Sequence, residues 1–125
     1  MPTSPVTVRL RARPDAAQRA RESLRSACHS VPGHLLYDAE LLTSEIVTNV
    51  ITHAGGMVTI VIDWDEHNLA VAVADDSPCG PTLRRSAPQD LGGRGMQLVD
   101  RLAASWGCNR RPDGAGKVVW FRLAI

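Results

Sequence analysis

The chain has 125 residues, with 14 Lys+Arg against 13 Asp+Glu and a net charge of +1. This length allows one domain with a real core and is too short for two, so we expect a single domain over residues 1–125. The balanced charge gives no general attraction to DNA or to anionic lipid, and we expect neither nucleic acid nor a membrane as a partner.

The cysteines and the N-terminal stretch indicate a cytoplasmic protein. Cys28, Cys79 and Cys108 are odd in number and widely spaced, which is not typical of a disulfide framework or of a CxxC metal site. The stretch MPTSPVTVRL lacks the apolar region of a signal peptide, and no later apolar run is long enough to span a bilayer. Basic residues cluster between Arg9 and Arg25, but acidic residues interrupt them, which favours a solvated helix face over a nucleic-acid patch.

The first elements change type cleanly along the chain. An alternating stretch from Val6, VTVRLRA, predicts a strand. The segment behind Pro14 that continues to Val31 has its apolar residues at helical spacing, and Pro32-Gly33 ends this helix. A second helix, ELLTSEIVTNVITHAGG, runs from Glu40 and stops at Gly55-Gly56.

Two strands follow around a turn from Asp65 to Asn68. The period of two gives the first strand one apolar face, made of Val58, Ile60, Ile62 and Trp64. The second strand has a matching face made of Leu69, Val71 and Val73, and the same period places Asp75 on it. The carboxylate of Asp75 is therefore expected at the end of a row of side chains that faces the core.

The last third contains a loop, a helix and two strands. The segment DSPCGPTLRRSAPQDLGG is rich in Pro, Gly and Ser, and RGMQLVDRLAASW then has apolar residues at helical spacing. Two closing strands, near Ser105 to Arg110 and Gly116 to Ile125, are joined by the turn Pro112-Asp113-Gly114. Together the elements predict an α+β fold, with a helix layer packed on one antiparallel or mixed sheet.

The second helix carries the first stretch that is suited to chemistry. Glu45 and Asn49 are four residues apart and share one helix face. An amide oxygen is a suitable neutral ligand for Mg²⁺, and a carboxylate one turn earlier can accept a proton from a nucleophile. Taken alone, such a pair more often consists of two ordinary polar residues at the edge of a helix.

Asp75 is the second candidate. An ionised carboxylate only accepts hydrogen bonds, so it can hold the exocyclic amine of adenine, whereas guanine has an oxygen at that place and is repelled. The alternative is that Asp75 or Asp76 simply begins a turn with Ser77-Pro78.

The third candidate is the stretch GGRGMQLV. Gly92, Gly93 and Gly95 let the backbone approach a ligand closely, and the helix that follows offers unpaired N–H groups to anionic oxygens. Arg94 can add charge-assisted hydrogen bonds to phosphate. The alternative is a flexible loop whose last glycine starts a helix. A P-loop is not present, because GAGKVV near Lys117 lacks both the upstream glycine and the following Ser or Thr.

The order of these motifs resembles the GHKL (Bergerat-fold) ATP-binding superfamily, and within it the small anti-sigma-factor serine/threonine kinases of actinobacterial type. The residues that carry the resemblance are ExxxN and HA on one helix, the strand ending in Asp75-Asp76-Ser77, GGRGMQLVD, and the closing GKVVWF. It covers nearly the whole chain. It implies a two-layer sandwich of a mixed, mostly antiparallel sheet with helices on one face.

The resemblance also implies a role for each matching residue. Asn49 would bind Mg²⁺, Glu45 would be the general base, and Asp75 would bind the adenine of ATP. The remaining positions of the nucleotide site are His53, which lines the phosphate region, Ser77, and the phosphate-cradling glycine box Gly93, Arg94 and Gly95 with Met96 after it. Residues Cys79 to Leu91 would form a short ATP lid. Many relatives have Gly at Ser77 and Thr at Val118, and both departures bear on the affinity for ATP.

The implied activity is transfer of the γ-phosphoryl group of Mg²⁺·ATP to a serine or threonine of a STAS-domain antagonist, by a kinase that also sequesters a sigma factor. Dimers are common among similar proteins, which leaves a homodimer open. Three alternatives also remain open. They are an ATP-binding partner-switching regulator without kinase activity, a free-standing catalytic domain that acts on histidine, and an α/β interaction domain without a ligand.

Overall fold

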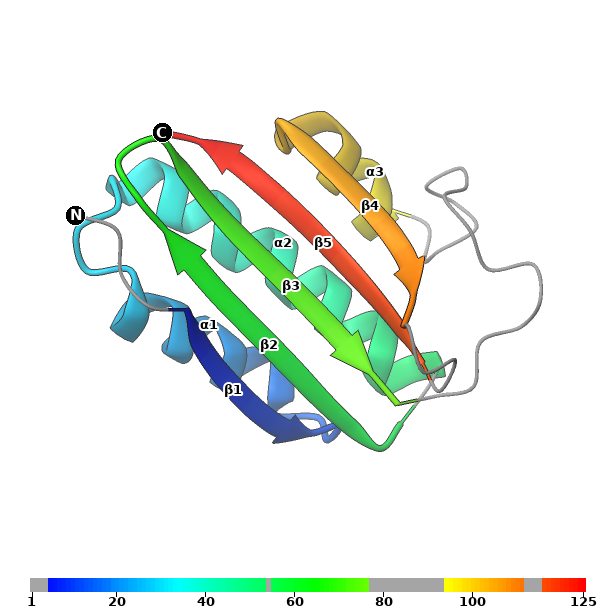
Figure 1. Ribbon diagram of the computed structural model, residues 1–125. Helices are drawn as coiled ribbons and strands as arrows, with labels where there is room; N and C mark the ends of the chain where they lie inside the picture. Colours follow the sequence, from blue (N-terminus) through cyan, green and yellow to red (C-terminus); the bar gives the residue numbers. More distant parts are fainter. Residues whose placement is uncertain (1–4, 54, 77–93, 112–115) are drawn as a thin grey trace.

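Three helices lie on one face of a five-stranded sheet in the part of the chain that the structure describes (Figure 1). The structure is a computed structural model, and it describes residues 5–53, 55–76, 94–111 and 116–125. The elements in chain order are β1 (Val6–Arg11), α1 (Ala16–Ala27), α2 (Gly33–His53), β2 (Met57–Trp64), β3 (Asn68–Asp75), α3 (Arg94–Leu102), β4 (Ser105–Arg110) and β5 (Lys117–Ala124).

The strand order across the sheet is β1-β2-β3-β5-β4, and each of these neighbouring pairs is antiparallel. Strand β3 is central, with β2 on one side and β5 on the other. This arrangement confirms the predicted α+β sandwich with its helices on one face.

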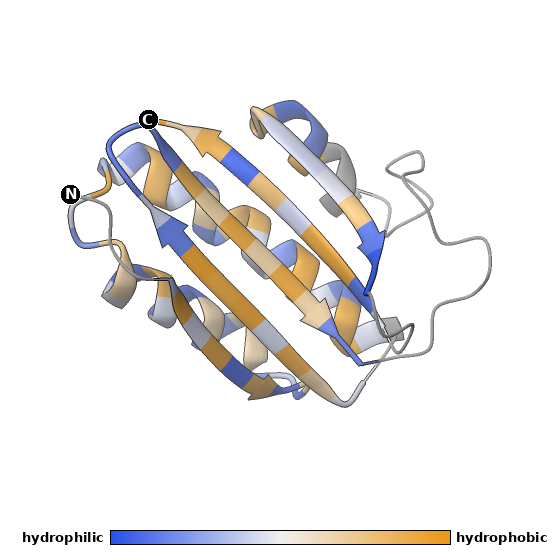
Figure 2. Ribbon diagram, in the orientation of Figure 1, coloured by the Kyte–Doolittle hydropathy of each residue, from blue (hydrophilic) through white to orange (hydrophobic). Residues whose placement is uncertain are grey.

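Alternation along the strands builds the core between the two layers. Every second residue is buried from Val58 to Ile62 in β2 and from Leu69 to Asp75 in β3, as the period of two predicts, and the same holds for β5 from Val119 to Leu123. The apolar stripes of the sheet are visible in Figure 2. Phe121 of β5 is the largest fully buried side chain among the described residues.

Helix α1 is shorter than its apolar spacing predicts. Ala16, Ala20 and Leu24 are its buried residues, but the helix ends at Ala27 and not near Val31. Cys28 leaves the helical conformation at φ −108° and ψ 46°, while its N–H still donates to the Leu24 carbonyl. Val31 is nevertheless buried in the core. The sequence periodicity therefore identified a core residue that the helix itself does not contain.

Helix α2 begins earlier than the sequence indicated and ends where the glycines require. It starts at Gly33, directly after Pro32, whose carbonyl accepts the N–H groups of Leu35 and Leu36. The helix ends at His53, and Gly55 and Gly56 follow with φ of +79° and +78°. Only glycine takes this left-handed backbone without steric cost, so the pair stops the helix and turns the chain into β2.

The turn from Asp65 to Asn68 joins β2 to β3, as predicted. The Asp65 carboxylate accepts the N–H groups of His67 and Asn68 at 2.7 and 2.9 Å, and these two hydrogen bonds lower the pKa of Asp65. The turn is thus fixed by its own first side chain.

Cys28 and Cys108 are buried, and neither forms a disulfide within the described part of the chain, which does not include Cys79. Burial raises the pKa of the Cys28 thiol to about 11. Among the described helices, none combines the length and the apolar character that crossing a membrane requires.

Candidate functional site

Asp75 is a buried carboxylate at the end of the central strand. Its side chain is 1% exposed, and it shares the inward face of β3 with Val71 and Val73. Lys117, the first residue of β5, lies directly opposite in the register and donates from Nζ to Asp75 Oδ2 at 2.5 Å. A buried negative charge is tolerated only when a positive partner compensates it, and the ammonium group of Lys117 is that partner.

The register also decides which residue of β5 faces the site. Lys117 shares its face with the buried residues Val119 and Phe121, whereas Val118 pairs with Ala74 on the opposite face of the sheet. Val118 therefore points away from Asp75. The hydroxyl that many relatives carry at its position would not reach this carboxylate, so Lys117 is the residue of β5 that bears on the site.

The end of β3 is held from a second side by Arg111. Its Nη1 donates to the Asp76 carboxylate at 2.6 Å and to the Asp75 carbonyl at 3.3 Å. Gly116 closes the same corner, since a Cβ at this position would lie 2.0 Å from the Asp75 carbonyl oxygen. Only glycine allows so close an approach of two backbone segments.

Glu45 and Asn49 lie together on one flank of α2. Ser44 and Glu40, which bond Arg21 and Arg25 of α1, occupy the flank toward α1. A helix turns about 100° per residue, which puts Glu45 and Asn49 on the other flank. Both side chains are half-buried.

The same corner of the molecule contains the end of α2 and the end of β3 (Figure 1). Helix α2 ends at His53, β2 begins at Met57, and Val58 of β2 pairs with Asp75. Asn49 precedes the helix end by one turn, which is about 5.4 Å along the axis. The structure thus brings Asn49 and Asp75 to one end of the sandwich although they are 26 positions apart in the sequence.

Helix α3 begins at Arg94, as the sequence indicated, and Gly95 of the predicted glycine box is its second residue. The ring N–H of Trp106 on β4 donates to Asp100 Oδ1 at 2.8 Å and fixes the helix to the sheet. The first turn of any helix leaves N–H groups without partners inside the helix, and such groups suit an anion.

Several predicted site residues fall outside what the structure describes. Ser77, Gly93 and the lid Cys79 to Leu91 lie in the undescribed segment. The structure places His53 in α2 and Arg94, Gly95 and Met96 in α3, but it does not describe their side chains. Their roles remain predictions.

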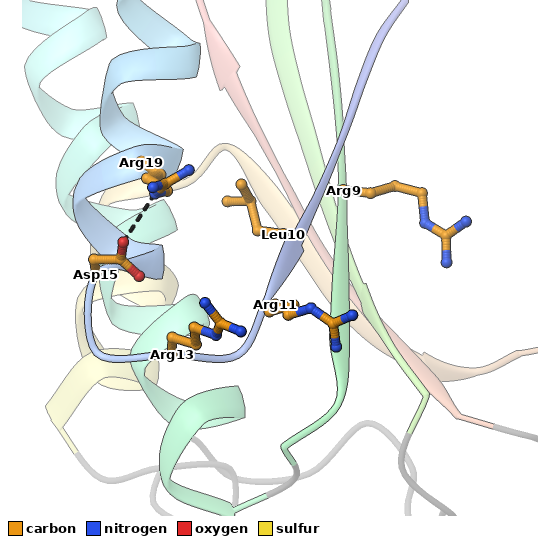
Figure 3. Close-up of a pocket in the computed structure, with 6 residues that line it drawn as sticks. All are labelled: Arg9, Leu10, Arg11, Arg13, Asp15 and Arg19. Atoms are coloured by element: carbon orange, nitrogen blue, oxygen red, sulfur yellow. Dashed lines mark hydrogen bonds and ion pairs between the residues drawn. The ribbon is translucent and has the colours of Figure 1, made fainter.

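A shallow hollow of about 190 Å³ lies at β1 and the start of α1 (Figure 3). Its lining residues are Arg9, Leu10, Arg11, Arg13, Asp15 and Arg19. Arg19 is already engaged by Asp15 at 2.9 Å, and the four arginines are exposed. This hollow shares no lining residue with the predicted nucleotide site.

The chemistry of the described site fits a nucleotide with Mg²⁺. A buried carboxylate provides a hydrogen-bond acceptor for a base, and a half-buried amide provides a neutral oxygen ligand. Within the described ranges, no three His, Cys, Asp or Glu residues form a cluster that could hold a metal alone. Mg²⁺ commonly takes only one or two protein ligands and completes its shell with water and phosphate oxygens, which suits Asn49.

Sequence reasoning missed Lys117, Arg111 and Gly116 as parts of this corner. Alternation in GKVVWF could have found Lys117, because a period of two from Phe121 back through Val119 leads to it. Arg111 and Gly116 gave no such signal. Their places depend on the pairing of β4 with β5, which only the folded chain shows.

Comparisons with known proteins agree with this arrangement. The fold is similar to the crystal structure of the RsbU and RsbW domains of Rv1364c from Mycobacterium tuberculosis, with a TM-score of 0.72 and 18% identity. The match covers 97% of this chain and 32% of that chain, so the present chain spans about a third of the length of the chain it matches. No curated protein sequence matches significantly. The model of the histidine kinase-like ATPase domain matches residues 10–123, nearly the whole sequence, and the chain therefore belongs to this family, whose ATPase description implies an ATP site.

Proposed function

We propose that the protein is a Mg²⁺-dependent serine/threonine kinase of the anti-sigma-factor type. In this proposal residues 1–125 form one catalytic domain that acts in the cytoplasm on a STAS-domain antagonist and also sequesters a sigma factor. The observation that carries the proposal is Asp75, a 1% exposed carboxylate at the end of the central strand, in the same corner as the flank of α2 with Glu45 and Asn49. The motif resemblance and the family support it.

Asp75 and Asn49 serve binding in this account. The Asp75 carboxylate accepts a hydrogen bond from the exocyclic amine of adenine. Because a carboxylate only accepts hydrogen bonds, it repels the oxygen that guanine has at the same place. The Asn49 amide oxygen holds the Mg²⁺ that accompanies the phosphates. The first turn of α3, with Gly93, Arg94 and Gly95 before and within it, receives the phosphate oxygens.

Glu45 serves transfer. Its carboxylate accepts the proton of the partner's hydroxyl, whose oxygen forms the new bond to phosphorus as the bond to the ADP oxygen breaks. Glu45 lies one helical turn before Asn49 on the same flank, so base and metal ligand are positioned by one rigid element. The protein's contribution is positioning and charge neutralisation.

The proposal is tested by incubation with labelled ATP and Mg²⁺ beside candidate STAS-domain proteins. We expect label on a serine or threonine of the partner. Glu45→Gln removes the base while keeping the shape, so it should keep ATP binding and lose transfer by about 100-fold or more.

Glu40→Gln is the matched control, because Glu40 is on the same helix but bonds Arg25 on the flank toward α1. It should transfer at the parental rate. Transfer by Glu45→Gln at the rate of the control would remove Glu45 from the chemistry. ATP binding by the parent with no transfer to any partner would favour the partner-switching regulator without kinase activity.

A further inference from the structure

Lys117 is the only lysine of a chain with 14 lysine and arginine residues in all. It lies beside Asp75, at the end of the proposed nucleotide site where the adenine base would bind. Its Nζ lies 2.5 Å from Asp75 Oδ2, and the two residues are direct partners in the β3–β5 register. The position is thus set by the sheet and not by a mobile surface chain.

The two side chains differ in their access to ligand. The Asp75 side chain is 1% exposed, whereas the Lys117 side chain is 22% exposed. A base that reaches the carboxylate from the open side of the pair therefore meets the ammonium group as well.

The pair offers an acceptor and a donor side by side. A lysine ammonium has three N–H donors, and the contact with Oδ2 uses one of them. The ring edge of adenine next to its exocyclic amine has the complementary order, with the amine as donor and the adjacent ring nitrogen N1 as acceptor. The ammonium group can rotate so that its donors reach two acceptors at once.

We infer that Lys117 is a second base-reading residue, which donates a hydrogen bond to adenine N1 while Asp75 accepts the exocyclic amine. The inference rests on the proposed nucleotide function. It adds a specificity rule to that function, since a purine with an N–H at position 1 meets a donor instead of an acceptor.

The test compares ATP with 1-deaza-ATP, in which a C–H replaces N1, by calorimetry with Mg²⁺. The parent should bind 1-deaza-ATP about tenfold or more weakly than ATP, as expected for the loss of a hydrogen bond to a charged donor. Lys117→Met should bind the two nucleotides with equal affinity. The triphosphate of purine riboside, which lacks the amine but keeps N1, should still bind Lys117→Met more weakly than ATP does, because that contact belongs to Asp75.

Lys117→Met leaves a buried carboxylate without its cation, and this change alone can prevent folding. Two measurements keep the inference testable in that case. The double variant Asp75→Asn/Lys117→Met removes both charges, and it too should fail to distinguish ATP from 1-deaza-ATP. In the unaltered protein, acylation of the single lysine by an amine-reactive ester, followed by mass spectrometry, should slow when ATP is saturating. A lysine peptide in the same tube serves as the control and should react at a constant rate.

Equal binding of ATP and 1-deaza-ATP by the parent would overturn the inference and leave the ATP site intact. Discrimination that persists in a folded Lys117→Met or in the double variant would do the same, as would a lysine that reacts equally fast with and without ATP. Failure of the parent to bind any of these nucleotides would instead remove the proposed function and, with it, this inference.

Discussion

Asp75 and Asp76 are neighbours in the sequence, but their side chains do different work. Asp75 is buried on the inward face of β3 and pairs with Lys117, whereas Asp76 is exposed and pairs with Arg111. Asp75 is the last residue of β3, where alternation along the strand places its side chain on the inward face, and Asp76 lies just past the end of the strand. At the scale of single residues, the direction of each side chain therefore decides whether it belongs to the site.

The amide of Asn49 is the residue on which Mg²⁺ dependence should rest. Asn49→Ala removes the amide oxygen and should abolish Mg²⁺-dependent ATP binding, so that calorimetry gives the same weak affinity with Mg²⁺ and with a chelator. Thr48→Ala is the control, since Thr48 is adjacent but exposed. Parental, Mg²⁺-dependent affinity in Asn49→Ala would take the residue out of the site.

Gly116 should tolerate no side chain. In Gly116→Ala the new Cβ meets the Asp75 carbonyl oxygen at 2.0 Å, and this backbone atom cannot move aside as a flexible side chain could. We expect a loss of about 1–3 kcal/mol in the free energy of unfolding, measured by urea titration, and a weaker ATP affinity. At Gly33 a Cβ meets nothing within 4 Å, so Gly33→Ala should be close to neutral. Equal stability of the two variants would show that the corner is not closed as described.

At the scale of elements, α2 serves the core and the site at once. One face of the helix is buried against the sheet through residues such as Leu42, Ile46 and Val50, and one flank carries Glu45 and Asn49. A rigid helix of 21 residues keeps both sets in a fixed relation. A core substitution that shifts α2 would therefore also displace Glu45 and Asn49.

Thr43 shows that the core face of α2 is not fully optimised for stability. Its Oγ1 is buried and has no hydrogen-bond partner among the described residues. Thr43→Val has nearly the same shape and removes the unsatisfied hydroxyl, so it should raise the free energy of unfolding by about 1 kcal/mol and the Tm by a few degrees. The control Thr48→Val changes an exposed residue of the same helix and should have little effect. A destabilised Thr43→Val would mean that the hydroxyl has a partner in solution.

Periodicity predicted the strands and their faces well, because burial on one face imposes a strict period of two. The inward row that ends in Asp75 is the clearest case, and the helix that begins at Arg94 was also expected. The C-terminal end of α1 and the start of α2 were not, since they depend on local hydrogen bonds at Cys28 and Pro32. The partner of Asp75 was missed for a related reason. Sequence shows that Lys117 alternates with Val119, but only the β3–β5 register puts it opposite Asp75.

At the scale of the whole molecule, the topology gathers the site at one end of the sandwich. Strand β3 ends there, β5 begins there, and α2 ends within a few residues of β2, which pairs with β3 (Figure 1). The basic hollow at β1 is built from other residues, and its arginines suit the exposed edge of the sheet, where charge discourages unwanted strand pairing. Every described residue with a proposed role in nucleotide chemistry thus lies in one corner of the molecule.

Calorimetry of ATP and GTP with Mg²⁺, on the parent and on Asp75→Asn, tests this assignment most directly. The parent should bind ATP at least about tenfold more tightly than GTP, because the buried carboxylate accepts the adenine amine and repels the guanine oxygen. Asp75→Asn, whose amide can also donate, should lose most of that preference while it remains folded. An undiminished preference for ATP in the variant, or no binding of either nucleotide by the parent, would contradict the account.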